Sequence, residues 1–504
     1  MENPEDWSCD ANQAVQVSLV QRGADQLTTL STFNPQYTYP IVGEEETIFG
    51  YKGLDIHLRF AAHDLKSNIL ISYNEKFPTV GDVEAVDLNK QWREWVPQSA
   101  FTPIADFKKS IQSDDSAKDF VPPGKLVHSY TGGQNGERNY EIWAGQLSDP
   151  GIRELLDRIQ VFVSFFIEAG TPIPTDDPDW TLSRWTVYFI YEKIQPPTPE
   201  TSPYSFVGYA TTYRLYYLDK DSKGPHIANE SFPLPQIDVT QLPARLRISQ
   251  FLIIPPHQGS GHGTHLYITI QNSCVADPTV NELTVEDPNE AFDALRDTVD
   301  FHVLRSEFIQ NKVTINSSPY DSDVRRNRPR LMPTSSVIPT KLLHEIRKKN
   351  KIEPTQFAHI LEMFLLGQIS PSSRGGGINM ASLLTQKWRL PKEDDRKYYW
   401  WRMLVKQRLY KRHRDMLIQV DLDERVEKLE QTLTNVEEGY DNLLKAFMAK
   451  EAAVDNAGEV DLPVGEGRVR SKRKLVVDDD DEDEDDEDAA GENGRAMKRP
   501  KTGE

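Results

Sequence analysis

The sequence predicts a mixed α/β (α+β) protein with an N-terminal α/β domain, a central sheet domain and a C-terminal helical domain. One observation is a glycine-rich segment at 258–263, which follows a strand-like apolar run and precedes a helix-like one. A second is the alternation of apolar and polar residues in several short segments ahead of it, which is typical of half-buried strands. A third is the series of long helical patterns beyond residue 340.

Length, composition and charge narrow the class of protein. The chain has 504 residues, 38% of them hydrophobic and 27% charged, so we expect two or three globular domains. The formal charge of −20 favours a basic partner and argues against direct binding of nucleic acid. Residues 451–504 contain 18 acidic and 9 basic residues, so this tail contributes −9 and the rest of the chain −11.

The cysteine content and the absence of long apolar runs indicate a reducing compartment and no membrane segment. Cys9 and Cys274 are too few for a disulfide framework or a cysteine-based zinc site. No apolar run is long enough to span a bilayer, and the acidic start MENPEDWSCD does not resemble a signal peptide. We therefore expect a protein of the cytoplasm and nucleus.

Residues 1–125 are predicted to form the N-terminal α/β domain. Residues 14–19 alternate as a strand does, and a turn at 50–53 leads into a second alternating run. Between them lie three consecutive acids, Glu44, Glu45 and Glu46. Such a run is most often a solvated loop, and the alternative is a docking patch for a lysine-rich peptide.

Residues 126–305 are predicted to form the central domain. Its order is strand, strand, helix, strand, strand, then a buried strand, the glycine-rich turn, a helix, a strand and a last helix. The segments concerned are 126–132, 139–147, 155–167, 184–193, 204–218, 248–254, 258–263, 266–270, 281–287 and 292–298. A glycine turn between strand and helix lets the backbone approach an anion, which the helix dipole attracts.

The glycine turn carries a resemblance to a known family. Gln258, Gly261 and Gly263 fill the order Gln-x-x-Gly-x-Gly, which resembles the acetyl-CoA diphosphate loop of the GNAT acetyltransferase superfamily. The longer text QFLIIPPHQGSGHG, followed by LTVEDPNEAFDALRD, resembles the catalytic subunit of type B histone acetyltransferases. EEETIFGYKGL near the N-terminus extends this resemblance, which covers most of residues 10–305.

The resemblance implies a GNAT core with a mixed, splayed sheet, acetyl-CoA as cosubstrate and no metal. It implies a strand bulge around Phe251 to Ile253, where the strand backbone pairs with the acetyl and pantetheine groups. We expect His262 to be a loop residue rather than a catalyst. The implied acetyl-CoA site comprises Phe251, Leu252, Ile253, Gln258, Gly259, Ser260, Gly261, His262, Gly263, Thr264 and Asn289.

Acetyl transfer to a lysine also needs a base, because an amine with a pKa of about 10.4 is protonated at neutral pH. Glu286 ends the strand that follows the glycine turn. The resemblance implies that Glu286 is the general base and that Asp287 and Glu168 support it. The alternative is that the Glu-Asp-Pro sequence only ends a strand and caps the next helix.

The resemblance further implies that the histone contacts Glu44, Glu45 and Glu46 together with Tyr213, Arg214 and Leu215. The second group belongs to an aromatic stripe at 209–217, and such stripes are more often core than binding surface. Arg214 and Leu215 depart from the more uniformly aromatic or polar pattern of the family.

Residues 306–452 are predicted to form the C-terminal helical domain, with helices at 340–351, 355–367, 398–416 and 422–452. The last helix has apolar residues at alternating spacings of four and three, so we expect it to pack along another helix, within this chain. The basic cluster at 406–414 beside Trp400 and Trp401 is either a nucleic-acid patch or, more often, a solvated face.

Residues 453–504 are predicted to be a disordered acidic tail. Two basic clusters, at 468–474 and 498–501, have the composition of nuclear-localisation signals and flank eleven consecutive acids.

The sequence therefore predicts an enzyme that transfers acetyl from acetyl-CoA to lysines of the histone H4 tail through a ternary complex. The partners that the resemblance implies are histone H4, the histone H3–H4 dimer and a WD40-repeat histone chaperone subunit. The alternatives are a GNAT acetyltransferase of small amines and a non-catalytic histone-binding scaffold.

Overall fold

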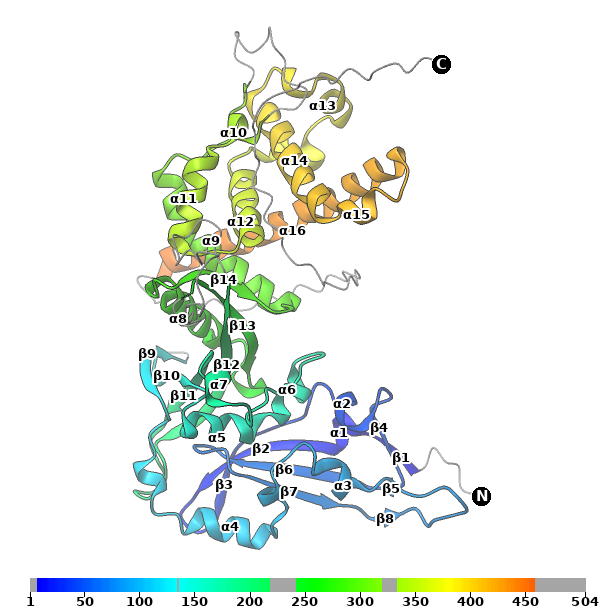
Figure 1. Ribbon diagram of the computed structural model, residues 1–504, viewed down its shortest axis with the longest axis vertical. Helices are drawn as coiled ribbons and strands as arrows, with labels where there is room; N and C mark the ends of the chain where they lie inside the picture. The colour runs from blue at the N-terminus through cyan, green and yellow to red at the C-terminus, as the bar shows by residue number, and fades with distance from the viewer. Residues whose placement is uncertain (1–6, 134–135, 218–241, 320–332, 458–504) are drawn as a thin grey trace, which may run out of the picture. The chain divides into compact units, whose positions relative to one another are not determined.

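The computed structural model describes residues 7–133, 136–217, 242–319 and 333–457 (Figure 1). It has a mixed α/β architecture with a β-rich N-terminal region, a curled mixed sheet and a C-terminal helical region. The predicted basic clusters and acid run of the tail lie outside the described residues. The described helices include no membrane-spanning candidate.

The N-terminal region is built on a four-stranded sheet with the order β3-β2-β6-β7. β2 and β6 are parallel, and the outer pairs are antiparallel. The strands are β2 (Val15–Arg22), β3 (Leu27–Phe33), β6 (Asp55–Ala61) and β7 (Ser67–Ser72). Smaller elements are β1 (Ser8–Asp10), β4 (Thr47–Phe49), β5 (Tyr51–Lys52), β8 (Glu75–Lys76), α1 (Ala11–Ala14), α2 (Tyr39–Val42), α3 (Leu88–Trp92) and α4 (Ile104–Gln112).

One hydrophobic core joins this sheet to the helices that follow it. Phe60 of β6 contacts Phe162 with ring centroids 4.8 Å apart, and both rings are fully buried. The single helix predicted at 155–167 is in fact two, α5 (Pro150–Ile159) and α6 (Val161–Phe166), separated at Gln160. Every residue of α6 is buried, so this helix lies inside the core and has no polar face toward solvent.

The central sheet has six strands in the order β14-β13-β12-β11-β10-β9. Only β13 and β14 are parallel. The strands are β9 (Lys125–Gly132), β10 (Arg138–Gln146), β11 (Trp185–Lys193), β12 (Tyr204–Tyr216), β13 (Ala244–Ile253) and β14 (Val280–Val285). Two helices, α8 (His262–Ala276) and α9 (Glu290–Gln310), follow β13 and β14, and α8 packs its apolar side chains against the sheet.

The C-terminal helices enclose a separate core. They are α10 (Thr334–Val337), α11 (Thr340–Asn350), α12 (Pro354–Gly367), α13 (Met380–Gln386), α14 (Glu393–Arg412), α15 (Arg414–Leu417) and α16 (Leu422–Ala457). The helix predicted at 398–416 is therefore broken at His413. The heptad pattern of α16 packs within the chain as predicted, because Leu433 and Tyr440 are buried against the other helices of this core, and Leu429, Val436, Leu443 and Phe447 are partly buried against it. Leu422 and Val426, at the start of the pattern, remain exposed.

Two members of the basic cluster at 406–414 are paired with acids, whereas Lys411, Arg412 and Arg414 are exposed. Trp400 and Trp401 are buried in the helical core. Arg408 forms an ion pair with Glu362 at 2.7 Å, and Lys406 pairs with Glu430. This arrangement supports a structural role for Lys406 and Arg408 and a solvated face for the exposed residues.

The helical region is bonded directly to the outer strand of the central sheet. The Leu283 amide donates to the Lys351 carbonyl at 2.8 Å, so the turn between α11 and α12 forms a parallel β-bridge with the outer edge of β14. The Lys351 ammonium group donates to the Cys274 carbonyl at 3.0 Å and to the Asp277 carbonyl, at the C-terminus of α8. The negative end of the helix dipole also stabilises a cation at this position.

A buried carboxylate lies at the same junction. Asp300 of α9 accepts hydrogen bonds from Tyr267 of α8 at 3.0 Å and from Gln356 of α12 at 3.0 Å. Asp300 is completely buried, and this burial raises its pKa to about 6 although Arg296 opposes the shift. Three helices thus share one titratable group.

We expect Asp300 to make stability depend on pH. The native carboxyl keeps its proton up to about pH 6, whereas an unfolded one loses it near 3.8, so stability falls as the pH rises between these values. The contribution is up to about 3 kcal/mol. Denaturant unfolding of wild type and Asp300→Asn at several pH values measures it. A difference between the two proteins that does not vary from pH 4 to 7 contradicts this prediction.

Candidate active site

The glycine turn brings the start of α8 next to the end of β13. A short 3-10 turn, η5 (Pro255–His257), follows the strand, and Gly259 and Gly261 have φ values of +72° and +84°. Glycine adopts this left-handed conformation without the strain that a side chain causes. Gly261 caps α8, whose first amides have no partner within the helix. The turn therefore presents backbone donors and the positive end of a helix dipole.

Next to the turn, β13 and β14 separate. Their parallel ladder ends at the pair Ile248 and Val285, while β13 continues to Ile253. The Ile254 amide donates to Val207 of β12, so the alternation of a strand directs the Ile253 amide to the opposite edge, where the ladder has ended. This edge can pair with an extended ligand.

A bulge occurs in β13, but two residues earlier than the sequence predicted. The register with β12 shifts between Ala210 and Thr212, which places Ser249 and Gln250 opposite a single residue. The Gln250 amide donates to the Thr211 hydroxyl at 3.0 Å. The bulge thus lies where β14 ends, rather than at Phe251 to Ile253.

Glu286 lies at that point, immediately after β14. Its amide donates to the Ile248 carbonyl at 2.9 Å, which fixes its backbone to β13. The Ser249 hydroxyl donates to Oε2 at 2.6 Å, and the Tyr213 hydroxyl lies 3.4 Å from Oε1. The carboxylate is exposed, so a substrate can reach it, and the two hydroxyls hold it from both sides. Asp287, also exposed, turns the chain with a φ of +36°.

Tyr213 and its neighbours divide between the two faces of β12. Tyr213 packs on Trp185 with ring centroids 4.6 Å apart, and burial together with the Glu286 charge raises the pKa of its hydroxyl. Arg214 instead pairs with Asp277 and donates to Thr279 at 2.9 Å. Leu215 is half-buried. The structure therefore joins Tyr213, but not the Arg214 side chain, to Glu286.

Glu168 lies in the turn after α6. The next residue, Ala169, has a φ of +54°, and its amide donates to the Tyr39 hydroxyl at 2.6 Å. The Glu168 carboxylate is exposed and adds to the burial that raises the pKa of Tyr37. Farther along this turn, the Thr171 carbonyl accepts from the Gln250 side chain at 2.9 Å, so the segment reaches the bulge.

The three consecutive acids do not behave alike. Glu46 accepts from the amides of Thr38 at 2.7 Å and Tyr39 at 3.1 Å, and from Asn12 at 2.8 Å. These hydrogen bonds hold its pKa below the usual value. Glu44 and Glu45 are exposed.

The remaining predicted residues surround the turn. Gln258 donates to the Ile253 carbonyl at 2.8 Å, and Asn289 caps α9 by accepting from Phe292 at 2.9 Å. His262 is not a loop residue, because it begins α8 and only 2% of its surface is exposed. Leu252 and Thr264 are buried, Phe251, Ile253 and Gly263 are half-buried, and Gly259 and Ser260 are exposed.

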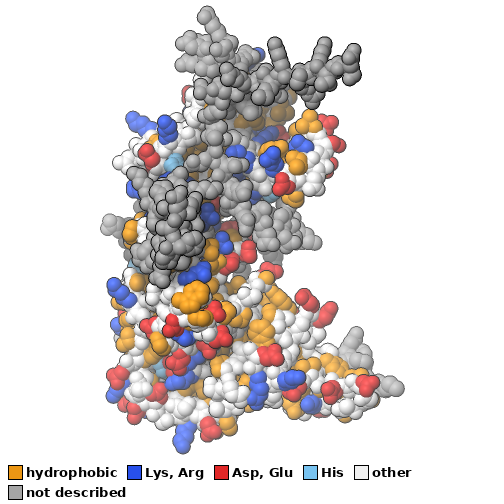
Figure 2. All heavy atoms as spheres, viewed as in Figure 1, with side chains coloured by type: hydrophobic (Ala, Val, Ile, Leu, Met, Phe, Trp, Pro, Cys, Tyr) orange, Lys and Arg blue, Asp and Glu red, His pale blue; other side chains and the backbone are white. Residues whose placement is uncertain are grey.

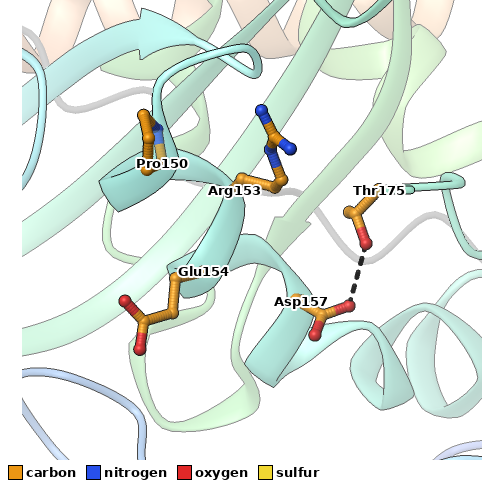
Figure 3. Close-up of a pocket in the computed structure, with 5 residues that line it drawn as sticks. All are labelled: Pro150, Arg153, Glu154, Asp157 and Thr175. Atoms are coloured by element: carbon orange, nitrogen blue, oxygen red, sulfur yellow. Dashed lines mark hydrogen bonds between the residues drawn. The ribbon is translucent and has the colours of Figure 1, made fainter. Parts of the chain in front are cut away.

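A surface cavity of about 210 Å³ lies away from these residues (Figure 3). Pro150, Arg153, Glu154, Asp157 and Thr175 line it, and the Thr175 hydroxyl donates to Asp157 at 3.1 Å. It contains none of the predicted site residues. Within the described residues, no group of three or more His, Cys, Asp or Glu side chains is arranged to hold a metal ion.

Sequence reasoning missed Ser249 and Trp185. Both contact residues that are distant in the chain. Ser249 donates a hydrogen bond to Glu286, and Trp185 packs on Tyr213. The one local signal was the polar pair Ser249 and Gln250 within the apolar part of the strand.

The chain is similar to known proteins over nearly its whole length. Residues 7–168 match a family model described as the N-terminus of the histone acetyl transferase HAT1. The chain is 59% identical to a histone acetyltransferase type B catalytic subunit from Aspergillus oryzae, over 94% of this chain and 96% of that protein. Counterparts from Aspergillus fumigatus and Neurospora crassa are 56% and 38% identical, over 94% of this chain and 85% and 95% of theirs.

Identity at this level over nearly the full length of both proteins shows a shared family. Membership makes the protein an acyltransferase, and this activity implies acetyl-CoA, a histone substrate and further subunits. The chain belongs to the family of histone acetyltransferase type B catalytic subunits.

Proposed function

We propose that acetyl-CoA binds between β13 and β14, in a sheet core of the GNAT type that spans residues 126–305. The observation that carries the proposal is the position of Glu286. It lies where β13 and β14 separate, and Ser249 of β13, the strand that leads to the glycine turn, donates a hydrogen bond to it. The α8 amides suit a diphosphate, and the β13 edge beyond Ser249 suits the amide groups of pantetheine. Phe251 to Ile253, Gln258 to Thr264 and Asn289 form the surroundings of this site.

Glu286 is the proposed general base. It takes a proton from the lysine ammonium group, and the neutral nitrogen attacks the thioester carbon. The carbon–sulfur bond then breaks, the CoA sulfur leaves as a thiolate, and the excess proton on nitrogen passes to this thiolate or to water, so no enzyme-bound acetyl group is formed. The Tyr213 and Ser249 hydroxyls orient the carboxylate, and Asp287 and Glu168 support it. A backbone amide at the strand edge can stabilise the negative charge on the thioester oxygen.

The proposed acceptor is a lysine of the histone H4 tail, presented as H4 or as the H3–H4 dimer with a WD40-repeat chaperone subunit. The exposed acids Glu44 and Glu45 supply charges for a basic segment, and Tyr213 with Leu215 borders the acceptor. Acidic and basic side chains are interspersed over the N-terminal region on the face drawn in Figure 2, so these contacts depend on particular acids rather than on a broad field. An acetyltransferase of small amines would not need them.

The proposed division of the chain is 1–125 for histone contact, 126–305 for catalysis, 306–452 for the helices and 453–504 for a tail. The basic clusters of this tail are proposed to direct the protein to the nucleus, so that it is present there as well as in the cytoplasm.

Replacing Gly261 with valine tests the acetyl-CoA site. A β-branched side chain strains the left-handed backbone at this cap, so the amides of the turn move. We expect a rise of at least tenfold in the KM for acetyl-CoA, with a cooperative thermal transition retained. Gly81→Val is the matched control, because Gly81 also has a left-handed backbone with open space beside it and lies outside the proposed site. Unchanged acetyl-CoA binding by folded Gly261→Val in calorimetry contradicts the assignment.

The acidic contact is tested with Glu44→Gln/Glu45→Gln. The KM for a basic histone peptide should rise while that for acetyl-CoA stays constant, and added salt should weaken the variant less than the wild type because fewer charge contacts remain to be screened. Glu46→Gln is the contrasting variant, since it should lower thermal stability by disturbing the bonds to Thr38 and Tyr39. Equal salt dependence in the double variant and the wild type argues against the contact.

Glu286→Gln tests the base. Glutamine keeps an oxygen for Ser249 but cannot accept the proton, so turnover should fall by roughly 10²–10⁴-fold while acetyl-CoA binding persists. A higher pH should restore part of the rate, because more of the lysine is already neutral. Asp287→Asn and Glu168→Gln should each lower turnover less than Glu286→Gln does. Near-normal turnover in Glu286→Gln, with loss in either of the other variants, would reassign the base.

A further inference from the structure

A cluster of aromatic rings lies beneath the first turn of α8. Tyr130 of β9 and Tyr140 of β10 come from the hairpin at the far edge of the central sheet, and His262 and His265 come from α8. Tyr130 stacks on His265 with ring centroids 3.8 Å apart and an interplanar angle of 10°. Tyr140 packs on His262 at 4.3 Å. The edge hairpin therefore contacts the helix that begins at the glycine turn.

A hydrogen bond connects the two sides of this cluster. The Tyr130 hydroxyl lies 2.8 Å from Nδ1 of His262. Burial lowers the pKa of His262 to about 4 and raises that of Tyr130, so both side chains are neutral at neutral pH. A neutral pair of one donor and one acceptor satisfies both polar groups in an apolar setting.

The position of His262 makes this contact important for the turn. Gly261 before it has a left-handed backbone, and a Cβ on Gly263 after it would lie 2.9 Å from Leu295. These glycines have no side chains that could fix the direction of the intervening amides. The imidazole between them is a buried group that ties this stretch to the sheet.

We infer that Tyr130 and His262 are positioning residues for acetyl-CoA, which hold the first amides of α8 in the direction that a diphosphate requires. The inference rests on the proposed acetyl-CoA site and adds the β9–β10 hairpin to it. Neither side chain is proposed to touch the reacting atoms, and Glu286 lies on a different element. The contact should therefore affect acetyl-CoA binding and leave the chemical step unchanged.

Tyr130→Phe removes the hydroxyl and keeps the stacked ring. We expect the KM and the calorimetric Kd for acetyl-CoA to rise roughly 3- to 10-fold, the worth of one buried hydrogen bond, while kcat and the histone KM stay constant. Tyr140→Phe is the matched control, because its hydroxyl bonds to Arg138 and not to the turn. It should retain wild-type kinetics. Thermal unfolding of both variants shows whether the fold is kept.

A second variant keeps the test decisive if Tyr130→Phe does not fold. His262→Gln retains a hydrogen-bonding group beside Tyr130, whereas His262→Leu has none, so acetyl-CoA should bind the glutamine variant more tightly. An unchanged KM in folded Tyr130→Phe, equal effects in both tyrosine variants, or equal binding by the two His262 variants overturns the inference. Gly261→Val separates the cases: if it also binds acetyl-CoA normally the proposed site is wrong, and if it does not, only the role of Tyr130 and His262 is wrong.

Discussion

The end of the β13–β14 ladder at Ile248 and Val285 is the constraint on which the site depends. Backbone amides and carbonyls require partners, so a strand edge left beyond its neighbour is suited to pair with another extended chain. The same separation places Glu286 at the exposed end of β14 and lets β13 reach the glycine turn. The end of this strand pairing thus leaves an open edge on β13, between the proposed base Glu286 and the glycine turn that begins α8.

The elements on both sides of this separation are held by the rest of the chain. The turn between α11 and α12 bonds to β14 and to the C-terminus of α8, and Asp300 connects α8, α9 and α12. The N-terminal sheet shares its core with α5 and α6, and the turn after α6 meets the bulge through Thr171. The helical region is therefore part of the structure that sets the distance between the glycine turn and Glu286.

Local patterns were sufficient to predict most strands and helices, the glycine turn and the position of Glu286, because each depends on residues close in sequence. The bulge was predicted two residues too late, since the register of β13 is fixed by Thr211 of another strand. Ser249, Trp185 and Tyr130 were missed because their partners are distant in the chain. The three acids looked equivalent in the sequence, yet only the fold directs Glu46 to the Thr38 and Tyr39 amides.

The most direct measurement is amide hydrogen exchange of the full chain with and without acetyl-CoA. Binding between β13 and β14 should slow exchange at Ile253 and in the first turn of α8 at 262–264, and leave the cavity residues of α5 unchanged. Protection around Arg153 and Asp157, with none at Ile253 or at the start of α8, would contradict the proposed site.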